Sequence, residues 1–387
     1  MNKVLIAGAG PVGLTAAFVL ARAGIAVDVF ERALEVAEDL RASTWHPPTL
    51  DMMGELGLVD EILKVGLIAR HTQYRDRRTG AIAQFDLELL RGETDHPYRV
   101  QYEQFRYTRM VIERLKAFPH ARVLLGTPVE TVVQTGSAVA VNGAFKGDYL
   151  IGADGGRSVV RESQGIEFEG FTFPERFYSV STTFDFTANL DRLCYVNYIA
   201  DVDEWCVLLK VPGFWRCLFP TRVDEDDEQV VADAPTQARL QGVLATTDPY
   251  KIVHRTIYRV HQRVAKQYRR GRSFLAGDAA HLNNPLGGMG MNGGLHDAIN
   301  LAGKLIAVHR GEAGDELLER YEPERRPIAI DYINASTARN KKLLEDRNPE
   351  ARKRAQDELC RMAEDPVAAK AFLMKGSMID AVRAVVA

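Results

Sequence analysis

Residues 3–13 read Lys-Val-Leu-Ile-Ala-Gly-Ala-Gly-Pro-Val-Gly, and residues 25–31 read Ile-Ala-Val-Asp-Val-Phe-Glu. The first apolar run is too short for a core helix, and Gly8, Gly10 and Gly13 follow it in the spacing Gly-x-Gly-x-x-Gly. An alanine-rich stretch without proline or glycine leads to the second apolar run, which ends in Glu31. This order predicts strand, turn, helix and strand, which is the context that a dinucleotide-binding fingerprint requires.

Each glycine of the fingerprint has its own physical reason. Gly8 permits the tight turn, Gly10 lets backbone N–H groups approach a pyrophosphate, and Gly13 lets the helix pack closely on the strand. The helix is predicted to begin near Pro11. Its first turn, which includes Val12, therefore offers unpaired N–H groups and the positive end of the helix dipole to an anion.

Glu31 ends the second predicted strand about twenty residues after the fingerprint, which is where an acid accepts hydrogen bonds from a ribose diol. A carboxylate there favours an unphosphorylated adenosine ribose, as in FAD or NAD, over NADP. Arg32 follows directly and is included in the candidate site. The alternative interpretation is a glycine-rich turn in an unrelated α/β protein.

Composition describes an ordinary globular chain. The 387 residues are 46% hydrophobic and 26% charged, and this length predicts two domains or one elaborated domain. The formal net charge of −3 gives no reason to expect a nucleic acid or an anionic membrane as partner. No run of eighteen apolar residues is present, and the four scattered cysteines suggest free thiols in a reducing cytoplasm. No metal site is expected, because the histidines lack ligand spacing.

Two further glycine-lined turns follow short apolar runs. Residues 149–158 read Tyr-Leu-Ile-Gly-Ala-Asp-Gly-Gly-Arg-Ser, which places Asp154 and Arg157 after a strand. Residues 274–278 read Phe-Leu-Ala-Gly-Asp, and the interval 285–294 contains five glycines before a helix predicted over 295–309. The five glycines at 287, 288, 290, 293 and 294 suggest backbone held against something flat or anionic.

The remaining chain divides by pattern. Residues 49–65 have helical spacing that glycines interrupt, residues 76–80 predict a hairpin turn, and residues 122–148 predict a meander of short strands. A helix is predicted over 101–118 and a wet-faced sheet over 175–260. We interpret the charged, proline-interrupted C-terminal part as packing helices without chemistry. The predicted units are a nucleotide domain of residues 1–69, 100–174 and 261–330, a substrate domain of residues 70–99 and 175–260, and a C-terminal helical segment of residues 331–387.

Together and in this order, the three turns resemble those of the single-component (group A) flavoprotein monooxygenases, the family of para-hydroxybenzoate hydroxylase. The resemblance rests on Gly8 to Gly13, on residues 152–161, and on residues 277–292. It covers about residues 1–330, and the chain from 331 carries no motif that we can place. It implies an α/β fold: a Rossmann-like FAD-binding domain with a discontinuous β-sheet substrate domain and C-terminal helices.

The resemblance also implies roles for single residues. Asp278 would hydrogen-bond FAD near its ribityl chain or pyrophosphate, the backbone of 286–292 would hold the flavin ring, and Asp154 with Arg157 would serve FAD and a transient nicotinamide. Arg41 and Gln101 stand where the family has flavin-contacting residues, and Pro285 would lie near the flavin edge. The residues expected to contact the cofactor are Gly8, Gly10, Pro11, Val12, Gly13, Glu31, Arg32, Arg41, Gln101, Asp154, Arg157, Asp278, Pro285, Gly288, Gly290, Met291 and Asn292.

The implied activity is hydroxylation of a small aromatic or heteroaromatic substrate with NAD(P)H and O2, through a C4a-hydroperoxide of the flavin. The substrate sheet would keep this species dry. A tyrosine or histidine could deprotonate a phenol, but the sequence singles out none. The chain is expected to be a monomer or homodimer. Prenyl reductases, Baeyer–Villiger oxygenases and a flavin-free binding protein like the Rab escort proteins remain alternatives, whereas the Trp-x-Trp-x-Ile-Pro signature of flavin halogenases is missing.

Overall fold

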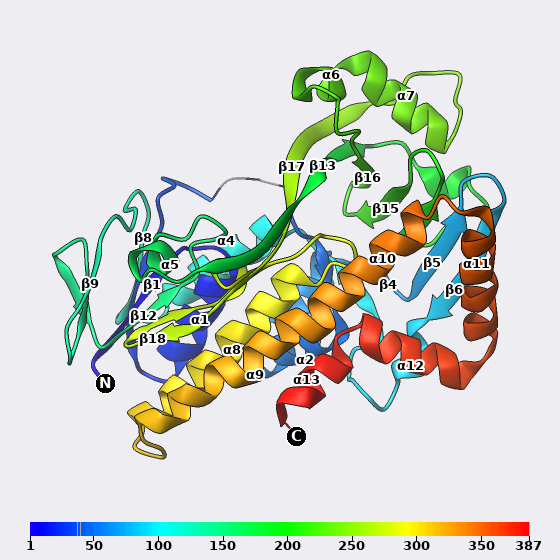
Figure 1. The fold of residues 1–387 in the computed structure, drawn as a ribbon. Helices are drawn as coiled ribbons and strands as arrows, with labels where there is room; N and C mark the ends of the chain where they lie inside the picture. The colour runs from blue at the N-terminus through cyan, green and yellow to red at the C-terminus, as the bar shows by residue number, and fades with distance from the viewer. Residues whose placement is uncertain (37, 39, 387) are drawn as a thin grey trace.

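The computed structural model describes residues 1–36, 38 and 40–386. Within these residues the strands form a six-stranded sheet, an eight-stranded sheet and two three-stranded sheets. Figure 1 shows the two large sheets in separate parts of the molecule, connected by the long paired strands β13 (Phe168–Thr182) and β17 (Ile252–Ala265). The α/β class with a separate β-sheet unit and C-terminal helices is confirmed.

The six-stranded sheet, here called the parallel sheet, has the strand order β18-β19-β12-β1-β2-β8. Its pairs are parallel apart from the edge strand β18. The carboxyl ends of its parallel strands therefore meet at one edge, where open α/β sheets bind ligands. The strands are β1 (Lys3–Ala7), β2 (Ala26–Phe30), β8 (Ala121–Leu124), β12 (Tyr149–Gly152), β18 (Arg269–Arg270) and β19 (Ser273–Leu275).

The predicted meander over 122–148 is only partly right. Strand β8 leaves it and pairs in parallel with β2, with Val27 opposite Ala121, because its apolar residues extend the buried parallel sheet. The following strands do form an antiparallel meander in the order β11-β10-β9. They are β9 (Val132–Gln134), β10 (Val139–Val141) and β11 (Phe145–Gly147).

The eight-stranded sheet, here called the mixed sheet, has the order β20-β17-β13-β16-β15-β14-β5-β6. Its one parallel pair among these strands joins β14 to β5, and the predicted hairpin turn after Asp76 is confirmed between β5 and β6. The strands not yet given are β5 (His71–Asp76), β6 (Gly80–Asp86), β14 (Val196–Ala200), β15 (Cys206–Val211), β16 (Phe214–Pro220) and β20 (His281–Leu282).

A small antiparallel sheet, β3-β7-β4, contacts the mixed sheet through β7 and β15. It consists of β3 (Thr44–Trp45), β4 (Leu67–Ala69) and β7 (Arg99–Gln101). The helical stretch predicted over 49–65 is split by Gly57, which adopts φ +70° between α2 (Pro47–Glu55) and α3 (Val59–Val65). Glycine relieves the strain of that backbone.

Helix α1 (Pro11–Arg22) follows β1 and packs on α8 (Gly290–His309) and α4 (Gln104–Leu115). In Figure 1 the C-terminal helices, drawn in orange and red, continue from α8 and cover strands β5 and β6 of the mixed sheet. No helix in the described part of the chain combines the length and apolar character needed to cross a bilayer. The other helices are α5 (Val159–Ser163), α6 (Asp227–Val231), α7 (Asp233–Val243), α9 (Tyr321–Pro327), the π-helix η5 (Ile328–Asn334), α10 (Ala335–Glu345), α11 (Pro349–Glu364), α12 (Pro366–Gly376) and α13 (Ile379–Val386).

Candidate active site

The turn after β1 contains two glycines that the protein itself requires and one that it does not. A Cβ on Gly8, at φ +98°, would lie 2.3 Å from the carbonyl oxygen of Ala153, and a Cβ on Gly13 would lie 2.0 Å from the carbonyl oxygen of Gly8. Gly10 has extended backbone and no protein atom within 4 Å of a Cβ position. The space beside Gly10, at the first turn of α1, is therefore open.

Val12 joins this turn to two later segments. A Cβ added to Gly277 or Gly294 would lie 2.8 or 2.7 Å from its side chain. Pro11 occupies the first position of α1, where its missing N–H costs no hydrogen bond. The start of α1, the turn before Asp278 and the start of α8 are thus in direct contact.

Glu31 directly follows β2 and turns back toward the glycine-rich turn. Its carboxylate accepts hydrogen bonds from the N–H of Ala9 at 3.0 Å and from the N–H of Ala33 at 3.0 Å. Glu31 is half-buried, whereas Arg32 is exposed. The carboxylate is held at the carboxyl edge of the parallel sheet.

Asp154 follows β12 at the same edge. One carboxylate oxygen accepts a hydrogen bond from the N–H of Val160 at 3.1 Å, near the start of α5. The other is buried and has no hydrogen-bond partner among the described residues, and burial raises the pKa of this carboxyl. Arg157 lies on the same turn and is exposed. Asp154 therefore keeps one acceptor atom unused.

Asp278 and Arg41 come together from distant parts of the chain. The Asp278 side chain is exposed, yet desolvation by the surrounding protein raises the pKa of its carboxyl, and positive charge on His281 and Arg41 opposes that rise. Asp278, Asp154 and Glu31 follow the parallel strands β19, β12 and β2, so the three acids lie along one edge of the parallel sheet.

A buried ion network lies beneath Asp278. Asp297 of α8 accepts hydrogen bonds from the Gly277 N–H at 3.1 Å, from His281 at 2.8 Å and from Nε of Arg325 at 2.7 Å. Burial alone would raise the pKa of Asp297, but Arg325 and His281 hold it well below its usual range. Every oxygen of this carboxylate is satisfied by the protein, so the network fixes the backbone that carries Asp278.

The glycine-rich loop before α8 is pressed against the small sheet. Gly287 and Gly288 adopt φ +119° and +67°, and a Cβ on Gly288 would lie 2.9 Å from Cβ of Thr44. The helix predicted from residue 295 instead begins at Gly290, because Gly293 and Gly294 serve close packing inside the helix. Pro285 and Met291 are half-buried on this loop and the first turn of α8.

Asn292 has its side-chain groups occupied within the protein. Its oxygen accepts from the His46 N–H at 3.0 Å, and its amide donates to the carbonyls of Thr44 at 2.8 Å and Gly288 at 2.7 Å. His46 in turn contacts the carbonyl of Gly287 at 2.8 Å, and burial places the pKa of this histidine well below its usual range. These hydrogen bonds hold the glycine loop against the strand β3.

The helix predicted to open at Gln101 is wrong at its start. Gln101 ends the strand β7, and α4 begins at Gln104, because pairing with β3 and β4 outweighs the local helical pattern. The Gln101 side-chain oxygen accepts from Thr44 at 3.1 Å, while its nitrogen is buried without a partner among the described residues. The position still lies beside the glycine loop, through Thr44.

A cavity that the sequence did not indicate lies next to this loop. It is bounded by Gly287 and Met289 from the loop, by strands β5, β7 and β14, and by helices α10 and α12. Its walls include Tyr74 and Tyr198, which are stacked with ring centroids 5.2 Å apart, and the ring of Phe372. The C-terminal helices thus close the cavity, so interpreting them as packing elements alone was incomplete.

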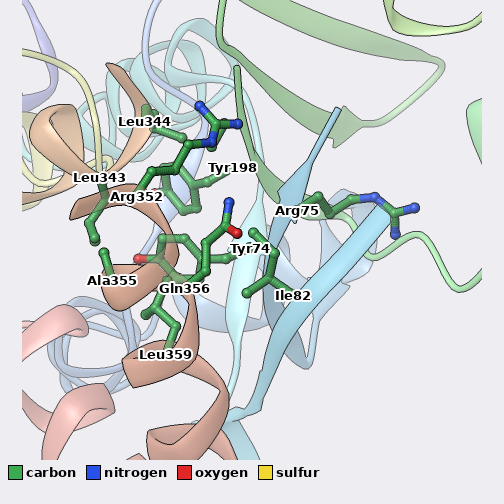
Figure 2. A pocket seen from close by; sticks show the side chains of 11 residues that line it. Tyr74, Arg75, Ile82, Tyr198, Leu343, Leu344, Arg352, Ala355, Gln356 and Leu359 are labelled. Carbon is green, nitrogen blue, oxygen red and sulfur yellow. The ribbon is translucent and has the colours of Figure 1, made fainter. Parts of the chain in front are cut away.

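A second cavity shares Tyr74 and Tyr198 with the first (Figure 2). Leu343, Ala355 and Leu359 of the C-terminal helices face Tyr74 there, whereas Arg75 points away. None of the residues around it belongs to the glycine loop. Within the described residues no group of three potential ligands is placed to hold a metal ion. The cavity beside Gly287 is therefore the one that adjoins the glycine loop.

Comparison with known proteins agrees with this geometry. Residues 1–336 match the family described as FAD binding domain. The chain is 32% identical over 362 residues to para-nitrophenol 4-monooxygenase of a Pseudomonas species, covering 91% of this chain and 89% of that protein. It is 34% identical over 364 residues to 6-hydroxy-3-succinoylpyridine 3-monooxygenase of Pseudomonas putida, covering 90% of each.

A solved structure gives the same result. The crystal structure of p-nitrophenol 4-monooxygenase from Pseudomonas putida superposes with a TM-score of 0.92 at 29% identity, covering 98% of this chain and 99% of that one. The expected cofactor FAD, with NAD(P)H and O2 as co-substrates, follows from the family. The chain belongs to the single-component, FAD-dependent aromatic monooxygenases.

Proposed function

We propose that FAD lies along the carboxyl edge of the parallel sheet. Three observations support this. The space beside Gly10 is open, Asp154 keeps a buried oxygen without a partner, and Gln101 keeps a buried amide nitrogen without one. These features fit an extended ligand with phosphate and hydroxyl groups. When bound, FAD supplies the redox chemistry that couples NAD(P)H and O2 to ring hydroxylation.

In this proposal the site residues act in two ways. Gly10 contacts the cofactor through open backbone, and Glu31, Arg41, Asp154, Arg157 and Asp278 contact it through polar side-chain atoms. Asn292 acts by holding the loop, because its side chain is already hydrogen-bonded within the protein. We further propose that Pro285, Gly288, Gly290 and Met291 present backbone to the flavin ring. Gly8, Pro11, Val12, Gly13 and Arg32 complete the turns that surround it.

We propose a single-ring phenol or hydroxypyridine as substrate. The observation that carries this proposal is the cavity with tyrosine and phenylalanine walls that shares Gly287 and Met289 with the glycine loop. The names of the two relatives above specify a nitrophenol and a hydroxypyridine. Aromatic walls of this kind offer stacking contacts to a ring placed against them and exclude water from it.

The organisation of the chain is part of the proposal. Residues 1–69, 100–174 and 261–330 would form the FAD-binding unit, residues 70–99 and 175–260 the substrate unit, and 331–387 a helical cover. The protein would act in the cytoplasm as a monomer or homodimer.

The test is a panel of phenols, hydroxypyridines and aromatic acids added to FAD-loaded protein. We expect at least one member to stimulate both NAD(P)H oxidation and O2 consumption, with a product heavier by one oxygen atom. The Gly10→Ala variant is the matched control, because its added methyl group occupies only space that is proposed for the cofactor. A panel without any stimulation or product would contradict the proposal.

A further inference from the structure

Arg99 is a buried cation without a carboxylate partner. It is 4% exposed, and no acidic side chain among the described residues forms an ion pair with it. Nη2 donates to the carbonyl of Gly376 at 2.8 Å, whereas Nε and Nη1 have no acceptor within the described chain. Arginine carries five N–H donors, so most of its capacity is unused.

Burying the Arg99 guanidinium in this way destabilises the fold unless another group compensates its charge. Burying a charge without a partner is strongly unfavourable. Gly376 ends α12, so the negative end of that helix dipole offsets part of the cost. One carbonyl leaves two guanidinium nitrogens unsatisfied, however, and holding α12 does not require them.

The unsatisfied groups border the cavity beside the glycine loop. Thr72, 3% exposed, also lines this cavity, and its hydroxyl has no partner among the described residues. Arg339 lines the same cavity from α10, with its guanidinium carbon 5.2 Å from the ring centroid of Phe372. The cavity therefore combines two cations and a free hydroxyl with aromatic walls.

No acid balances these cations. The residues that line the cavity include no aspartate or glutamate. Burial raises the pKa of Tyr74, which lines the same cavity, and the nearby charges of Arg339 and Arg99 each oppose that rise. A ligand in this cavity would therefore meet positive charge from its walls.

We propose that Arg99 binds an anionic oxygen group, a carboxylate or a phenolate, carried by the aromatic substrate. The inference rests on the function proposed above and adds the substrate class. The stacked pair Tyr74 and Tyr198 borders the ring, Thr72 offers a hydroxyl, and Arg339 reinforces the positive potential. Charge-assisted hydrogen bonds are the strong ones in such a site.

Binding to FAD-loaded protein without NAD(P)H tests this directly. The carboxylate arm compares 4-hydroxybenzoate with 4-hydroxybenzamide, which has the same shape and no charge. The phenolate arm follows 4-nitrophenol across neutral pH, where its phenol ionises. Kd is measured by calorimetry for the wild type, Arg99→Met, Arg99→Lys and Arg75→Met. Arg75 is the matched control, since it is a buried arginine of the mixed sheet that does not line this cavity.

We expect Arg99→Met to weaken binding of the anionic ligand about 10- to 100-fold, the range of a lost charged hydrogen bond. The neutral amide should change less than about threefold by the same reasoning, Arg99→Lys should restore part of the loss, and Arg75→Met should change neither ligand. The inference is overturned if Arg99→Met weakens both ligands equally, or if the wild type binds neither acid nor phenolate. Anion preference without any phenol-stimulated NAD(P)H oxidation would instead contradict the proposed function.

Discussion

Arg325 and Arg99 are buried almost equally, at 3% and 4% exposure, but their surroundings differ. Arg325 lies 2.7 Å from a carboxylate of Asp297 and also donates to the carbonyl of Gly293. Arg99 has one carbonyl and two unsatisfied nitrogens. The protein completes the first site by itself, whereas the second is complete only when something else supplies an anion.

The same difference separates Gly13 from Gly10 on one turn. A side chain on Gly13 would collide with protein backbone, whereas a side chain on Gly10 would meet empty space. Residues whose polar groups are paired, or whose surrounding space is filled, within the protein form the framework. Residues with unpaired polar atoms, or with open space beside them, face ligands. The predictions below test whether this division holds.

The largest effect is expected at the framework acid. Asp297→Asn leaves Arg325 and His281 buried without a carboxylate, which should lower the free energy of unfolding by about 3–5 kcal/mol. The pKa of Asp297 is depressed in the folded state, so its contribution is present above the unfolded carboxyl pKa of about 4 and is lost as pH falls below it.

Denaturant unfolding at pH 7 and at decreasing acidic pH measures this effect. The gap between wild type and Asp297→Asn should narrow below pH ~4, where the unfolded acid becomes protonated. A gap that stays constant, or widens, through this range would mean that the ion network does not stabilise the fold as charged groups.

The next prediction compares the two glycines. Gly13→Ala should lower the free energy of unfolding by about 1–3 kcal/mol or more, because its Cβ would overlap a carbonyl oxygen. Gly10→Ala should leave the apoprotein as stable as the wild type and weaken FAD binding. Thermal unfolding of the apoproteins and flavin titration separate the two; equal FAD affinity of Gly10→Ala and wild type would argue against the proposed path of the cofactor.

A smaller effect is expected at Asp154. Burial raises its pKa, so its ionised form is disfavoured in the folded protein. The variant Asp154→Asn can still accept from the Val160 N–H, and its apoprotein should be slightly more stable than the wild type at neutral pH. The stability change has this sign because a carboxyl whose pKa is raised by folding destabilises the folded protein when it is ionised. This destabilisation disappears when the pH falls below the pKa of the carboxyl in the unfolded chain. The same variant should bind FAD more weakly, and unchanged titration of FAD would show that the free oxygen does not face it.

The local sequence pattern was sufficient to predict the three glycine-rich turns of the candidate site. The turns at Gly8, Asp154 and Asp278 each follow a short apolar strand, and parallel pairing places them at one edge. Gln101 was misassigned because β7 exists only through pairing with β3 and β4, far away in sequence. No local pattern reports such a strand.

The cavity escaped prediction for the same reason. Its walls come from residue 72 to residue 376, and the C-terminal helices carry no motif. One signal was available: Arg99 stands beside Val100 and Gln101 in a short stretch whose residues are all buried. A charge in such a stretch is informative, because isolated cations are rarely buried. Recognising it, however, required knowing that the stretch is internal.

The most direct test of the division is the stability of Arg325→Met and Arg99→Met in FAD-loaded, substrate-free protein, measured by urea unfolding. Arg325→Met should lower the free energy of unfolding by about 3–5 kcal/mol, because it leaves the buried Asp297 carboxylate without its arginine partner. Arg99→Met should lower it by no more than about 1 kcal/mol, the value of the hydrogen bond from Arg99 to Gly376. Equal losses in the two variants would show that Arg99 is as much a part of the framework as Arg325, and the account given for it would be wrong.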